Sequence, residues 1–137
     1  MDERETVIHY RIERAYEALE EAELLIEHQH YTSAANRLYY ACFYATSALL
    51  TRHDMSAARH SRAIALFNQH FVKTKVVEPE VGKTLNRLFD VRNRGDYEPL
   101  VRLSEEEVRY FQQRAQQFVD TVAALARQPI PQQEEAP

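Results

Sequence analysis

The sequence predicts an all-α protein, an up-and-down bundle of four to five helices, from three observations. The 137-residue chain contains only two glycines and five prolines, which leaves little material for β-hairpin turns. Ala, Leu, Glu, Arg and Gln, which favour helices, are abundant. Apolar residues also recur at steps of three and four, as they do on one face of a helix. The length suits one domain with a single core, which we expect at residues 1–128.

The periodicity predicts three helices in the first half of the chain. An apolar stripe that starts at Ile8 predicts a first helix ending near His28. The segment 31–51 is apolar on nearly every side, which predicts a central helix covered by other helices or by a second subunit. After a loop, a third helix should begin near His60 and end near Lys73.

Two further helices and a tail are expected in the second half. Pro79 suits the first turn of a fourth helix, and Gly95 is its expected stop. Ser104 and Glu107 have the spacing of a capping box and should begin the last helix. Residues 129–137 are rich in proline and have no helical period, so we expect a disordered tail.

The composition argues against several classes of protein. The single cysteine, Cys42, lies in an apolar segment and is expected to be a buried thiol without a disulfide partner in the chain. The six histidines do not show the spacing of a metal site, so no metal or cofactor is expected. The acidic N-terminus lacks the apolar core of a signal peptide, and no apolar stretch could span a bilayer. These features predict a cytoplasmic protein without a membrane partner.

Positive charge is concentrated in the middle of the chain. Residues 37–102 carry eleven Lys and Arg against six Asp and Glu, a net charge of +5, although the whole chain is at −4. Residues 1–36 and 103–137 are both net negative. Such a segment is typical of an anion site, or of a bundle surface that carries charge wherever it meets water.

The stretch LFDVRNRGDYEP, residues 88–99, has two possible interpretations. In the first it ends a helix, with Gly95 in the left-handed conformation and Arg92 and Arg94 next to the negative end of the helix dipole. However, Arg92 also continues the apolar stripe that starts at Val81. An arginine on such a face must be paired or must border a cleft, because burying it alone is costly. The second interpretation is therefore that Arg92 contacts a phosphate.

Three motifs together resemble the HEPN family of prokaryotic helical-bundle proteins. They are NRLYYACFYATSALL at residues 36–50, RHSRAIALFNQHFVKT at 59–74 and LFDVRNRGDY at 88–97. The similarity covers roughly residues 8–125, and the motifs fall in the expected order on the expected helices. The chain is most similar to small stand-alone HEPN proteins in which the arginine of the fourth helix is followed by an Asp-Tyr pair.

The resemblance implies a homodimer whose two subunits contribute polar residues to one shared cleft. Many members are ribonucleases or toxins, often encoded beside a small nucleotidyltransferase that acts as antitoxin. Active members carry an arginine followed about four to six residues later by a histidine. The histidine moves a proton as the ribose 2′-hydroxyl attacks, and the arginine stabilises the phosphate.

The sequence departs from this pattern, because no histidine follows Arg92; the last one in the chain is His70. Asp96 lies near the position of the missing base, and beside two arginines it should be ionised and paired. We therefore expect weak or no ribonuclease activity.

Three residues could compensate in part for the missing histidine. His60 matches a histidine often present at the start of the third helix in this subgroup, and Tyr40 and Tyr97 could hydrogen-bond a phosphate or stack on a base. Alternatively, His60 is a helix-start residue bonded to a carboxylate, and Tyr40 is a core tyrosine with a satisfied hydroxyl.

These observations define a set of candidate site residues and leave three hypotheses. The catalytic candidates are Arg92, Asp96, Tyr97 and His60, and the candidates for binding RNA or a nucleotide are Arg92, Arg94, Arg37 and Tyr40. The first hypothesis is a noncatalytic binding module paired with a nucleotidyltransferase, in a toxin–antitoxin or defence system. The second is a metal-independent ribonuclease toxin with an unusual base. In the third, the dimer is a scaffold without a ligand.

Overall fold

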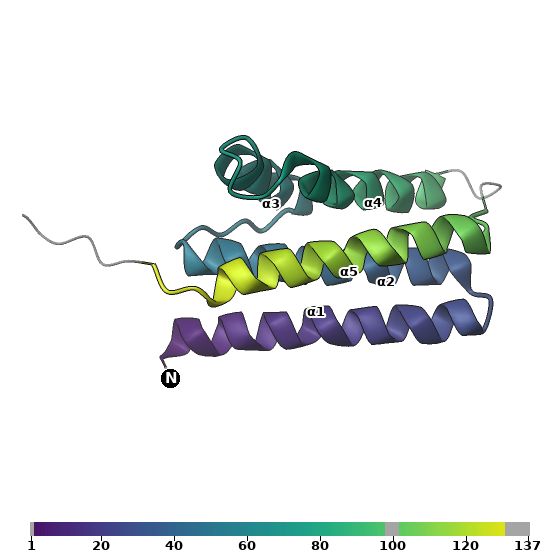
Figure 1. Ribbon diagram of the computed structural model, residues 1–137, viewed down its shortest axis with the longest axis horizontal. Helices are drawn as coiled ribbons and strands as arrows, with labels where there is room; N and C mark the ends of the chain where they lie inside the picture. The colour runs from purple at the N-terminus through teal and green to yellow at the C-terminus, as the bar shows by residue number, and fades with distance from the viewer. Residues whose placement is uncertain (1, 98–101, 131–137) are drawn as a thin grey trace, which may run out of the picture.

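The computed structural model describes residues 2–97 and 102–130, and side chains within residues 2–94 and 102–130. All regular structure in these ranges is helical, which confirms the predicted all-α class. The elements are α1 (Glu3–Glu27), α2 (Tyr31–Arg52), α3 (His60–Phe67), the π-helical η1 (Asn68–Val72), α4 (Pro79–Tyr97) and α5 (Glu105–Arg127). Helices α1, α2, α4 and α5 run along the long axis of the molecule, and α3 lies at one end of α4 (Figure 1). The expected disordered tail lies largely outside the described residues.

Several helix ends form as their residues predict. Asp2 caps α1 by accepting a hydrogen bond from the backbone N–H of Glu5 at 2.8 Å. Pro79 occupies the first position of α4, where its missing N–H costs nothing. The capping box of α5 is confirmed: the Glu107 N–H donates to Ser104 Oγ, and the Ser104 N–H donates to Glu107 Oε1, both at 3.1 Å.

The expected helix stop at Gly95 is wrong, because α4 continues through this residue to Tyr97. Glycine disfavours a helix interior by only about 1 kcal/mol relative to alanine, and this does not by itself end a helix. The left-handed residues that follow α1, α2 and η1 are instead Gln29, Asp54 and Lys75, with φ of 64°, 58° and 67°. This chain therefore makes left-handed turns with residues other than glycine.

Helix α2 is the centre of the bundle, as its composition predicts. It packs against α1, α3, α4 and α5 of the same chain, and these neighbours account for its apolar composition without a second subunit. One stripe of α2 remains half-buried; it consists of Asn36, Arg37, Tyr40, Phe43, Tyr44, Ser47 and Thr51. We refer to these residues as the α2 stripe.

Arg52 joins three helices at one end of the bundle. It is only 5% exposed, and its guanidinium binds both carboxylate oxygens of Glu5 at the start of α1. Its Nε also donates to the carbonyl oxygen of Ala126, near the end of α5, at 2.7 Å. The buried charge is thus paired and hydrogen-bonded, as a charge in such a place must be.

Gly82 in the first turns of α4 packs directly on η1. A methyl group at this position would lie 2.6 Å from Cγ2 of Val72, well inside van der Waals contact. Glycine therefore permits a close approach of α4 to the segment that follows α3.

We predict that Arg52→Ala lowers the free energy of unfolding by roughly 1.5–3 kcal/mol, because hydrogen bonds to charged groups are lost. Denaturant unfolding at neutral pH measures the change. The matched control is Arg4→Ala, which breaks an exposed pair with Asp54 and should cost less than about 1 kcal/mol.

The stabilisation by Arg52 should also depend on pH. Arg52 lowers the pKa of Glu5, so the stabilisation is present above the ordinary glutamate pKa and is lost as the pH falls through the pKa of Glu5 in the folded state. Equal losses in the two variants would contradict this role of Arg52.

Candidate functional site

The candidate site is built around Arg92, in the last turns of α4. Its apolar stripe includes the buried residues Val81, Leu85 and Leu88, and Arg92 continues it as a half-buried side chain. Its Nη2 donates to the hydroxyl of Tyr40 at 3.2 Å. The guanidinium carbon lies 5.2 Å from the ring centroid of Tyr39 and 5.3 Å from that of Tyr40, within the range of cation–π interactions. Helix α2 thus holds Arg92 by aromatic rings and a hydroxyl.

His60, the first residue of α3, lies against the same part of α2. Its ring stacks on Phe43 with centroids 4.0 Å apart, and its Nδ1 is 2.8 Å from the hydroxyl oxygen of Tyr39. Among the described side chains, the hydrogen-bond partner of His60 is the Tyr39 hydroxyl and not a carboxylate. Burial, and secondly the charge of Arg92, lower the pKa of His60 below its ordinary value. The imidazole is therefore neutral at pH 7.

Five side chains form this group, which we call the Arg92 cluster: Tyr39, Tyr40, Phe43, His60 and Arg92. Three of them, Arg92, His60 and Tyr40, were predicted as site residues, and the fold brings them together from α4, α3 and α2. Tyr40 is half-buried, so it is not a core residue. Its hydroxyl accepts a hydrogen bond from Arg92.

Tyr39 and Phe43 were missed by the sequence analysis. Tyr39 is fully buried, and this burial raises the pKa of its hydroxyl well above the ordinary value. The signal that could have found both residues is the helical spacing, because position 43 lies three residues after Tyr40 and four after Tyr39 and is a surface neighbour of both.

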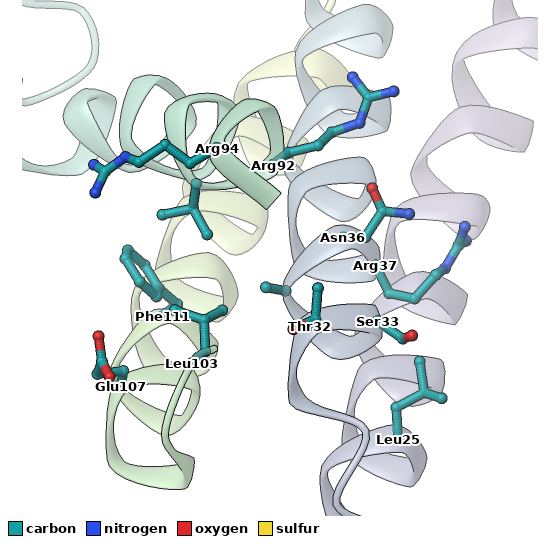
Figure 2. A pocket seen from close by; sticks show the side chains of 12 residues that line it. Leu25, Thr32, Ser33, Asn36, Arg37, Arg92, Arg94, Leu103, Glu107 and Phe111 are labelled. Carbon is teal, nitrogen blue, oxygen red and sulfur yellow. The ribbon is translucent and has the colours of Figure 1, made fainter. Parts of the chain in front are cut away.

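The other predicted binding residues lie outside the cluster, and of these Arg37 borders it. Arg37 is paired with Glu21 at 3.2 Å, and its guanidinium carbon is 5.6 Å from the ring centroid of Tyr40. Arg94 is exposed, and Figure 2 shows its guanidinium pointing to the opposite side of α4 from that of Arg92. The side chains of Asp96 and Tyr97 lie outside the described residues.

A pocket of about 590 Å³ adjoins the cluster, with Arg92 at its border. It lies between the end of α4, the first turns of α2 and the start of α5, and Figure 2 shows Arg37 and Asn36 on its α2 side and Phe111 on its α5 side. Its volume is within the range of roughly 300–1,000 Å³ that small-molecule sites have.

Several other candidate chemistries find no support in the part of the chain described. Cys42 is fully buried, and this burial raises its pKa, so the thiol is not a thiolate at neutral pH. Among the residues whose placement is described, no three His, Cys, Asp or Glu side chains gather where they could hold a metal ion. None of the helices there has the length and apolar character needed to cross a membrane.

Within its described residues the protein is thus a helical bundle in which side chains from α2, α3 and α4 meet in the Arg92 cluster. The HEPN domain profile matches residues 8–125, so the chain belongs to the HEPN domain family and the resemblance predicted from its motifs is confirmed.

Several curated proteins are similar over most of their length. A "UPF0332 protein" of Thermotoga maritima is 44% identical over 125 residues, which cover 91% of this chain and 95% of the relative. "Putative toxin MJ0605" of Methanocaldococcus jannaschii is 32% identical over 111 residues, or 81% of this chain and 82% of the relative. "Putative toxin MJ0142" of the same organism is 29% identical over 109 residues, or 80% and 74%.

Proposed function

We propose that this chain is a toxin-like HEPN protein that binds RNA or a nucleotide through Arg92, Tyr40 and His60. In this proposal it is a cytoplasmic protein of a toxin–antitoxin or defence system, and a small nucleotidyltransferase is its antitoxin. Two similar proteins carry the word toxin in their names, which supports the toxin-like class. The observation that carries the binding role is the environment of Arg92.

The described side chains that hold Arg92 leave its charge available. Among the described side chains no carboxylate lies within salt-bridge distance of Arg92, and its hydrogen-bond partner there is the neutral hydroxyl of Tyr40. A guanidinium presents donors in a planar fork that matches phosphate oxygens. The tyrosine rings beside it offer surfaces on which a base could stack. The net positive charge of residues 37–102 would favour the approach of a polyanion.

A homodimer is the second part of the proposal. The apolar interior of α2 is covered within one chain, but Tyr40, Phe43 and Tyr44 on the α2 stripe are only half-buried. A second copy placed over this stripe and the neighbouring part of α4 would cover the rings and place two Arg92 clusters in one cleft.

Ribonuclease activity is the second candidate function, favoured by one specific observation. His60 and Arg92 both lie against Tyr40, and burial lowers the pKa of His60, which favours its neutral form at pH 7. A neutral imidazole beside a phosphate-binding arginine is the pair of groups that general-base cleavage of RNA requires. Asp96 and Tyr97 remain further catalytic candidates. We favour binding without efficient cleavage, because the histidine that usually follows the arginine is absent.

We predict that Arg92→Ala weakens binding of a fluorescein-labelled single-stranded RNA by roughly tenfold or more, because one charge-assisted phosphate contact is lost. The dependence of affinity on salt should fall by roughly 0.7 in its log–log slope, the amount expected for one contact to a single strand. Fluorescence anisotropy measures both. Arg87→Ala, an exposed arginine on the same helix, is the control and should retain most of the affinity. Unchanged binding in a folded Arg92→Ala would place the site elsewhere.

We predict a homodimer of the 16.1 kDa chain in gel filtration with light scattering. Tyr44→Glu should shift it toward the monomer, because it places a charge on the covered stripe. Tyr10→Glu changes a tyrosine that is 61% exposed on α1 and should leave the dimer intact. A wild-type monomer at tens of micromolar would remove the shared cleft from the proposal.

We predict weak or no cleavage of labelled RNA by the purified protein in the presence of a chelator. Robust cleavage would contradict this, and its loss in His60→Ala would identify His60 as the base. If activity survives in His60→Ala and Tyr97→Phe but not in Asp96→Asn, Asp96 is the base.

A further inference from the structure

The buried hydroxyl of Tyr39 is hydrogen-bonded to one ring nitrogen of His60. Tyr39 is 0% exposed, and within the described part of the chain its hydroxyl has one hydrogen-bond partner, Nδ1 of His60 at 2.8 Å. The bond can run in either direction. Either Tyr39 donates to an unprotonated Nδ1, or a protonated Nδ1 donates to the tyrosine oxygen.

The bond in which Tyr39 donates to Nδ1 leaves fewer buried polar groups without a hydrogen-bond partner. A buried O–H without an acceptor costs roughly 1–3 kcal/mol, and Nδ1 is the acceptor that the surrounding side chains offer. If Nδ1 carried the proton, the Tyr39 O–H would have no acceptor among the described residues. Burial raises the pKa of Tyr39, so its hydroxyl keeps its proton, and His60 is neutral with one N–H. That single proton therefore belongs on Nε2.

We propose that Tyr39 is a positioning residue that holds His60 as the Nε2–H tautomer, so that the Arg92 cluster presents hydrogen-bond donors to a bound phosphodiester. The Tyr40 oxygen already accepts from Arg92, which leaves the Tyr40 proton free to donate. Arg92 itself is a donor only. The identity of the anion as an RNA phosphate rests on the proposed function, whereas the tautomer does not.

The Nε2–H tautomer allows His60 to bind a phosphate but not to act as the general base of RNA cleavage. A general base must accept the proton of the ribose 2′-hydroxyl on a free lone pair. In the Nε2–H tautomer the lone pair of His60 is on Nδ1, where it accepts the hydrogen bond of the buried Tyr39. His60 can therefore donate to a phosphate oxygen but cannot act as a base through Nε2. The proposed tautomer thus favours the binding module over the ribonuclease.

NMR of the full chain labelled with ¹⁵N-histidine tests the proposal directly, because protonated and unprotonated ring nitrogens resonate at well-separated ¹⁵N shifts. At neutral pH, Nε2 of His60 should have the shift of an N–H nitrogen and Nδ1 that of a lone-pair nitrogen; comparison with His60→Gln assigns the signals. In Tyr39→Phe both tautomers should be populated, so that the two shifts move toward each other. Tyr10→Phe, at an exposed tyrosine of α1, should leave them unchanged.

A wild-type spectrum that shows the proton of His60 on Nδ1 would overturn the proposal, and this measurement does not depend on the folding of any variant. An unchanged tautomer in a folded Tyr39→Phe would overturn the role of Tyr39. Titration with inorganic phosphate should shift the Nε2 signals in the wild type but not in Arg92→Ala; unmoved wild-type signals would contradict the anion contact. Failure of RNA binding with the Nε2–H tautomer in place would reject only the proposed function, since the tautomer experiment uses no RNA.

Discussion

The enclosure of α2 determines where this protein can present reactive groups. Four helical neighbours bury most of its surface, and a polar side chain on those sides would lose its hydration. The α2 stripe is the one side of the helix that remains half-open in the described structure. Side chains from α3 and α4 reach this side, so His60 and Arg92 meet there although they are far apart in sequence. The cluster is therefore a consequence of how the bundle packs around one helix.

The buried Arg52 and the half-buried Arg92 are held by the fold in different ways. Arg52 is neutralised by Glu5 and hydrogen-bonded to a backbone carbonyl, so its charge is used inside the protein. Arg92 is supported by aromatic faces and by the Tyr40 hydroxyl, which stabilise a cation without cancelling its charge. The first arrangement suits a structural joint between helices. The second suits a site for an anion.

The sequence was sufficient for the helices, and for the parts of the site that depend on local pattern. The position of Arg92 on an apolar stripe was visible, because helical periodicity places residue 92 on the face of Val81, Leu85 and Leu88. The end of α4 could not be predicted, because a glycine near a helix terminus is compatible both with the end of the helix and with its continuation. His60 was suggested only by the resemblance to a family.

The role of Tyr39 could not be predicted, because it depends on a contact between residues 21 positions apart. In sequence Tyr39 is one aromatic residue in an apolar helix, and nothing local indicates whether its hydroxyl has a partner. That partner lies on α3, which comes against α2 only in the packed bundle.

The close contact of Gly82 with Val72 links the geometry of the site to a position remote from it. Helix α3, which η1 continues directly, carries His60, and α4 carries Arg92 about 15 Å along its axis from Gly82. The first turns of α4 rest on Val72. If a larger residue at 82 tilted α4 about this contact, Arg92 would move further than the residues at the contact itself. Among homologous chains, positions 72 and 82 are therefore expected to covary, a bulkier side chain at one being matched by a smaller one at the other.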